Sequence, residues 1–95
     1  MSLTRDRDAL ALRQLREAVA RGVRTTSIPR SDVTTIRATL LRLRSENDAA
    51  IHVAPLVDSA CRRLLDAIVS DALRLAHVRD VDILLTFAAS RARVA

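Results

Sequence analysis

The sequence has few of the residues that β-structure, disulfide scaffolds and glycine-rich active-site loops require. Its 95 residues include one glycine, two prolines, one cysteine and a single aromatic side chain, Phe87. Hydrophobic residues still make up 49% of the chain. Because strands favour β-branched and aromatic residues, this composition predicts an all-α fold in one small domain.

These shortages also exclude several kinds of chemistry. One cysteine cannot build a disulfide framework or a zinc knuckle, and one glycine cannot form a phosphate-cradling loop. Cys61 and the nearer downstream histidine, His77, fall on one predicted helix about 24 Å apart at 1.5 Å per residue, too far to act as nucleophile and base. The two histidines, each with a single carboxylate nearby in sequence, Asp48 and Asp80, do not make up a metal-ligand set. We expect no enzymatic activity, no metal and no cofactor.

The hydropathy pattern argues against a membrane protein. No apolar run reaches the roughly 18 residues of a membrane span. The first residues, Met-Ser-Leu-Thr-Arg-Asp, are too charged for the core of a signal peptide. A single cysteine suits a reducing compartment. We therefore expect an unprocessed intracellular protein that does not enter the membrane.

Lysine is absent, and the 16 basic residues are all arginines, which gives a net charge of +5. Residues 1–44 hold ten arginines against four acids, whereas residues 45–95 hold six against seven. A GC-rich genome is the simpler explanation for the missing lysine, and a need for forked, phosphate-matching donors is the other. The asymmetry points to a polyanionic partner, either nucleic acid or an anionic membrane surface. With almost no aromatics to stack on bases, double-stranded recognition is favoured over single-stranded RNA.

Apolar residues spaced by three or four predict four helices of unequal length. The first covers residues 4–21 and ends at Gly22, and the second follows Pro29 and ends near Arg44. After a loop, no breaker interrupts residues 55–77, so one long central helix is predicted there. A short last helix follows, with Asp80 or Asp82 as its cap and its apolar residues between positions 83 and 88.

The predicted central helix has apolar residues on three sides. Its remaining side is a polar row at intervals of four, made up of Asp58, Arg62, Asp66, Ser70 and Arg74. We expect Arg62, Arg63 and Arg74 to be ion-paired with neighbouring acids. Since one small chain cannot bury so much apolar surface, the pattern predicts an obligate oligomer.

A short helix, a loop, a long helix and a second short helix resemble the histone fold, and several motifs resemble histone three. Ala11-Leu-Arg-Gln-Leu-Arg16, followed by Ile28-Pro29, resembles that histone's extra N-terminal helix and the start of its first fold helix. Leu73-Arg-Leu-Ala-His77 resembles the end of its long helix. Asp82-Ile-Leu-Leu85 with Arg91-Ala-Arg93 resembles its last helix and basic end.

The resemblance covers roughly residues 9–95 and divides the chain into an N-terminal helix with linker, 1–26, and a histone-fold domain, 27–95. It implies a DNA-packaging subunit of nucleosome-like chromatin in the nucleus, paired with a second histone-fold chain or with itself. Such proteins grip the duplex backbone without reading bases. The implied DNA contacts are Arg13, Arg16, Arg24, Arg30, Arg44 and Arg79, with His52 in the first loop. The implied self-association residues are His77 and Asp82.

Two other classes of protein stay open at this point. One is a small arginine-rich helical subunit of a ribonucleoprotein or other protein assembly, whose basic N-terminal half contacts RNA. The other is a homodimeric protein-interaction bundle without nucleic acid.

Overall fold

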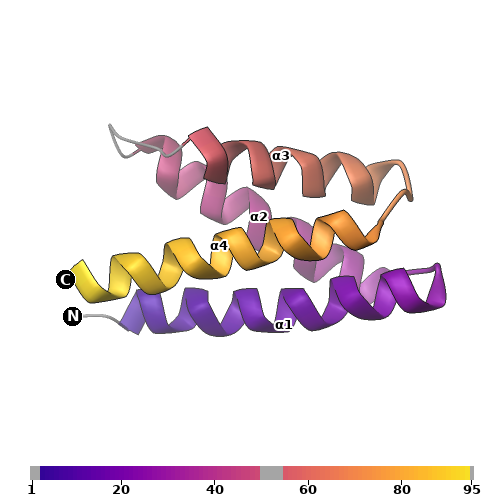
Figure 1. Ribbon diagram of the computed structural model, residues 1–95, viewed down its shortest axis with the longest axis horizontal. Coiled ribbons are helices and arrows are strands. Elements are labelled where there is room, and N and C mark those ends of the chain that lie inside the picture. Colours follow the sequence, from indigo (N-terminus) through magenta and orange to yellow (C-terminus); the bar gives the residue numbers. More distant parts are fainter. Residues whose placement is uncertain (1–2, 50–54, 95) are drawn as a thin grey trace.

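The computed structural model describes residues 3–49 and 55–94, and all of its regular structure is helical. The four helices are α1 (Leu3–Thr25), α2 (Arg30–Ala49), α3 (Pro55–Val69) and α4 (Leu75–Val94). Successive helices run in opposite directions, so α1 begins and α4 ends at the same end of the bundle (Figure 1). The prediction of an all-α protein is confirmed.

The helices form a ring in which each packs against two neighbours. α1 packs most extensively on α4 and also contacts α2, while α3 contacts α2 and α4. Among the described residues, α1 does not contact α3 and α2 does not contact α4. The side of the bundle made by α1 and α4 is therefore opposite the side made by α2 and α3. The molecule measures 38 × 22 × 20 Å.

Each helix turns a row of buried apolar side chains, spaced by three or four, toward the centre of the bundle. The rows are Leu12, Leu15 and Val19; Ile36, Leu40 and Leu43; Val57, Ala60, Cys61, Leu64, Ala67 and Ile68; and Val81, Leu84 and Ala88. The six residues named for α1 and α2 recur every three or four positions along the sequence, which predicts a buried face, and the structure confirms their burial. Cys61 is fully buried as a packing residue.

The prediction of one helix over residues 55–77 is wrong. α3 ends at Val69, where the Ala72 N–H donates to the Ala67 carbonyl (2.8 Å) and the Asp71 N–H donates to that of Ile68 (3.2 Å). Asp71 has a φ of 53°, so these bonds form a Schellman motif with aspartate at the left-handed position that glycine usually occupies. The sequence near Val69 therefore contains neither a glycine nor a proline that would predict the end of α3.

This break changes what the segment can do. The arrangement of short, long and short helices expected from the histone resemblance is not found in the described residues, where α3 has 15 residues and α4 has 20. The apolar sides of the segment fold onto one another and onto α1 and α2. The unbroken apolar surface that predicted obligate association is consequently absent.

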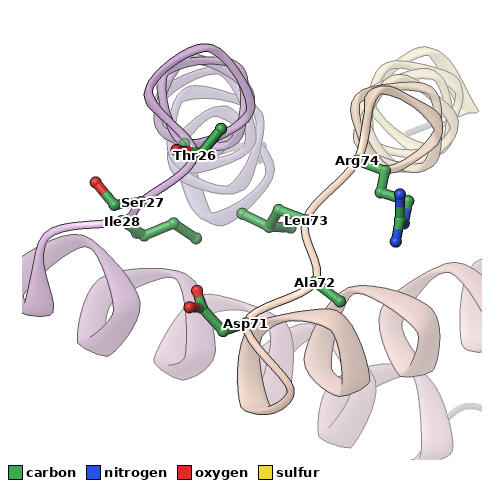
Figure 2. A pocket seen from close by; sticks show the side chains of 8 residues that line it. Thr26, Ser27, Ile28, Asp71, Ala72, Leu73 and Arg74 are labelled. Atoms are coloured by element: carbon green, nitrogen blue, oxygen red, sulfur yellow. The ribbon is translucent and has the colours of Figure 1, made fainter.

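Gly22, predicted to end the first helix, lies inside α1, which continues to Thr25. A Cβ atom at Gly22 would lie 2.7 Å from Ile28 Cγ1 and 3.2 Å from Leu73 Cδ1. Ile28 and Leu73 come from the two loops at one end of the bundle and point toward each other over a pocket of about 180 Å³ (Figure 2). The side chains of Ile28 and Leu73, one from each loop, thus occupy the space that a Cβ atom at position 22 would take.

The second helix is also longer than predicted. α2 includes residues 45–49, for which a loop was expected. Residues 51–53, where the alternation of apolar and polar side chains predicts a short extended stretch, lie outside the described residues.

Candidate nucleic-acid interface

Most of the arginines whose side chains the structure describes fall into two groups, and those of the first group join helices. Every seam between neighbouring helices holds at least one arginine–aspartate pair. The pairs are Arg16–Asp82 (2.7 Å) between α1 and α4, Arg21–Asp32 (3.2 Å) and Arg42–Asp8 (2.5 Å) between α1 and α2, Arg44–Asp58 (3.5 Å) between α2 and α3, and Arg63–Asp80 (2.9 Å) between α3 and α4. Each of these arginines therefore links two neighbouring helices.

The pair between Arg63 and Asp80 shows why arginine suits these seams. Arg63 donates from Nε to Asp80 Oδ2 (3.1 Å) and from Nη2 to Asp80 Oδ1 (2.9 Å), and Asp80 is 7% exposed. This hydrogen bonding, together with the negative charge of Asp80, raises the pKa of Arg63. A planar fork satisfies both carboxylate oxygens at once, which a lysine ammonium cannot do.

Two of the predicted DNA contacts belong to this first group. Arg16 binds Asp82, and Arg44 binds Asp58, which also binds Arg62 at 3.0 Å. Their positive charges are therefore largely compensated within the chain. The side chain of Arg16 nevertheless remains 53% exposed, and a guanidinium has donors beyond the Nε used here.

The ion pairing predicted for the arginines of the central helix, residues 55–77, is confirmed for Arg62 and Arg63. Arg62 pairs with Asp58 four residues earlier on the same helix, as its spacing predicts. For Arg74 the prediction is wrong, because no carboxylate in the described part of the chain pairs with it. Its side chain points away from the pocket between the loops (Figure 2).

The second group contains exposed arginines that have no ion pair within residues 3–49 and 55–94. These are Arg7, Arg13, Arg24, Arg30, Arg37, Arg74 and Arg79. Four of the predicted contacts, Arg13, Arg24, Arg30 and Arg79, are among them. His52, the predicted loop contact, lies outside the described residues.

A basic surface follows the outer side of α1, and we call Arg13, Arg16, Arg21 and Arg24 the α1 arginine face. Three of these arginines border a hollow of about 410 Å³ together with Glu17, Ala20 and, from α4, Val78. Arg13 lies one turn before Glu17, and from Arg13 to Arg24 the helix rises by about 17 Å.

Arg21 was not among the predicted contacts. Its position three residues before Arg24 was a usable signal, because residues three apart lie side by side on a helix.

The chemistry of this face suits an anion with several oxygens. Ala20 is small, so a ligand can approach the helix between the longer arginine side chains. Asp82 and Asp32 hold Arg16 and Arg21 from the neighbouring helices, which orients their guanidinium groups. Glu17 is the one acidic side chain that lines the hollow. Asp82 and Asp32 compensate the charges of Arg16 and Arg21, so the positive charge of this face that is available to phosphate comes from Arg13 and Arg24, which have no ion pair among the described residues.

The two residues predicted for self-association are both engaged within the chain. His77 lies in the first turn of α4, where its Nδ1 accepts a hydrogen bond from the Arg74 N–H (2.8 Å) and caps the helix. It is therefore not at the end of a longer helix, as the resemblance implied. Asp82 binds Arg16.

Other kinds of site find no support in the described residues. Three or more histidine, cysteine, aspartate or glutamate side chains do not gather there as a metal site requires. None of the described helices is long and apolar enough to cross a membrane. Comparisons with protein-family models, curated proteins and solved structures found no match. The exposed arginines are therefore the feature of the described residues that bears on function.

Proposed function

We propose that this protein binds double-stranded nucleic acid through the phosphate backbone, without reading sequence. The observation that supports this proposal is the α1 arginine face, whose four arginines follow about 17 Å of helix and three of which border a hollow. Phosphate oxygens accept forked hydrogen bonds from arginine, and such contacts position a protein on a duplex without sequence information.

Duplex binding is favoured over single-stranded binding by what accompanies the arginines. Proteins that hold single strands usually stack bases on exposed aromatic side chains. The chain's single aromatic residue, Phe87, is half-buried in a groove beside Leu56. The α1 arginine face thus offers charge and hydrogen bonds but no stacking platform.

The test is the salt dependence of affinity for duplexes of unrelated sequence. Each phosphate contact lowers the slope of log affinity against log salt by about 0.9, because counterions are released. Arg13→Ala and Arg24→Ala should each reduce the magnitude of that slope by about one unit. Arg62→Ala removes the same charge from an exposed side chain already paired with Asp58, and it should leave the slope nearly unchanged.

Two results would overturn the proposal. One is an absence of duplex binding at low salt, and the other is a preference for single-stranded RNA over duplexes. The second result would favour the ribonucleoprotein subunit instead. If Arg62→Ala and Arg24→Ala reduced the salt slope equally, duplex affinity would depend on the total charge of the protein and not on the α1 arginine face.

A finer form of the proposal adds DNA packaging in chromatin with a second histone-fold chain or a second copy. The motifs that resemble histone three over residues 9–95 support this finer form. The break between α3 and α4 does not support it. Sedimentation of the isolated chain tests it. A dimer or tetramer that His77→Ala splits would support the finer form, whereas a stable monomer at micromolar concentration would leave backbone binding alone.

A further inference from the structure

A second row of arginines follows the outer face of α2. Arg30, Arg37 and Arg44 are seven residues apart, which places them on one face of the helix. Arg30 and Arg37 are exposed and have no ion pair among the described residues, whereas Arg44 reaches Asp58 on α3. This α2 arginine row therefore lies on the side of α2 that borders α3.

The α2 arginine row and the α1 arginine face are on opposite sides of the bundle. Thr35 and Thr39 line the groove between α2 and α1. Arg37 lies between them in sequence, two residues from each, so it points to about the other side of the helix. The α1 arginine face borders α4 through Val78. Because the α1–α4 and α2–α3 sides are opposite in the ring, the two basic surfaces face away from each other.

The α2–α3 side also keeps a positive charge after its ion pairs are counted. Asp58 is shared by Arg44 and Arg62, so one carboxylate faces two guanidinium groups there. Asp66 is the other acid of α3, and it is exposed. Arg30 and Arg37 add two uncompensated charges to this side.

One straight duplex cannot contact both surfaces. They are separated by the body of a bundle that measures 22 × 20 Å across its shorter axes. A duplex would have to curl around that body, and bending 20–30 base pairs by only 40–90° already costs on the order of 1–6 kcal/mol. A second duplex reaches the free surface without this cost.

From this arrangement we infer that the α2 arginine row binds a second duplex, so that one copy of the protein bridges two duplexes. The inference rests on the proposed function, because it takes the α1 arginine face as the first duplex site. It adds a second site and a bridging activity to that proposal.

A bead-capture experiment tests bridging with the full chain. A biotinylated duplex is fixed on beads, a fluorescent duplex of unrelated sequence is added, and the fluorescence retained is measured as protein is titrated. We expect capture to rise and then fall, since excess protein occupies every duplex separately. Binding to one duplex is measured in parallel by fluorescence anisotropy.

Two double variants serve as matched controls for each other. Arg30→Gln/Arg37→Gln removes two charges from the α2 arginine row, and Arg13→Gln/Arg24→Gln removes two from the α1 arginine face. Glutamine keeps a long stem and a similar helix propensity, and helicity is verified by circular dichroism. At 0.1 M salt each lost phosphate contact weakens binding about eightfold, so each variant should lose at least about tenfold in capture. Each should still bind a single duplex through its intact surface.

The outcomes separate this inference from the proposed function. Capture that persists in either double variant would show that copies associate and each holds one duplex, which overturns bridging by a single copy. Single-duplex binding by the unmodified protein without capture would also overturn the inference and leave the proposed function intact. A lack of any duplex binding would refute both.

Discussion

Replacing Asp71 with glycine should stabilise the protein, because the backbone at this position is left-handed. The φ of 53° belongs to the Schellman motif that ends α3, in which the Asp71 and Ala72 N–H groups bond carbonyls of the last turn. A Cβ atom makes this conformation unfavourable, and glycine has none. The hydrogen bonds of the motif come from the backbone and should survive the change.

The expected gain follows from two opposing terms. A left-handed conformation costs an ordinary residue about 1–2 kcal/mol, and aspartate tolerates it better than most. Glycine loses about 0.5–1 kcal/mol more than alanine through its greater freedom in the unfolded chain. We expect a net stabilisation of about 0.5–1 kcal/mol, which in a domain of this size raises the melting temperature by about 2–8 °C.

The control is Asp71→Ala, and the measurement is thermal unfolding followed by far-ultraviolet circular dichroism. In the turn seen here, glycine should melt highest, aspartate next and alanine lowest. If residues 55–77 formed one continuous helix, the order would reverse, because alanine is the best and glycine among the worst residues in a helix interior. An alanine variant more stable than the glycine variant would therefore refute the break between α3 and α4.

Three other substitutions test the core, a seam and the close approach at the loops. Leu64→Ala should lower the free energy of unfolding by about 2–5 kcal/mol, since its side chain is fully buried; a loss under 1 kcal/mol in denaturant titration would contradict the packing. Arg63→Met should lower the melting temperature, because it leaves Asp80 buried without its fork, and an unchanged midpoint would mean that the pair is unimportant. Gly22→Ala should destabilise, as the contact with Ile28 costs about 1–3 kcal/mol and outweighs a helix-propensity gain of about 1; a more stable variant would show that the loops yield.

The periodic features of the fold could be predicted from the sequence, and its interruptions could not. Leu12, Leu15 and Val19 recur at helical spacing, and the structure buries all three. The end of α3 had no such signal, because aspartate occupies a position where glycine would have marked the break. Gly22 gives the opposite error, since a glycine in the sequence predicts the end of a helix, whereas in the structure it lies within α1 at a close approach of Ile28.

The candidate site shows the same division between local and long-range information. Arg62 and Asp58 are four residues apart in the sequence, so their ion pair could be predicted. The partners of Arg16 and Arg44 come from other helices, and no spacing along the chain reveals them. Exposure of an arginine is thus predictable from the helical period, whereas its freedom to bind an anion depends on which helix packs beside it.

This dependence changes where the basic surface lies. The sequence places its excess of positive charge in residues 1–44. In the structure, however, Arg42 and Arg44 from that half are ion-paired. Arg74 and Arg79 from the other half are exposed and have no ion pair in the described part of the chain. Packing therefore spreads the available cations around the bundle, although they are clustered along the chain. A distributed set of this kind gives each surface only a few phosphate contacts, so affinity for one duplex should be modest and strongly salt-dependent. The second surface then adds little to the binding of a single duplex, and its effect should be measurable only when two duplexes are present.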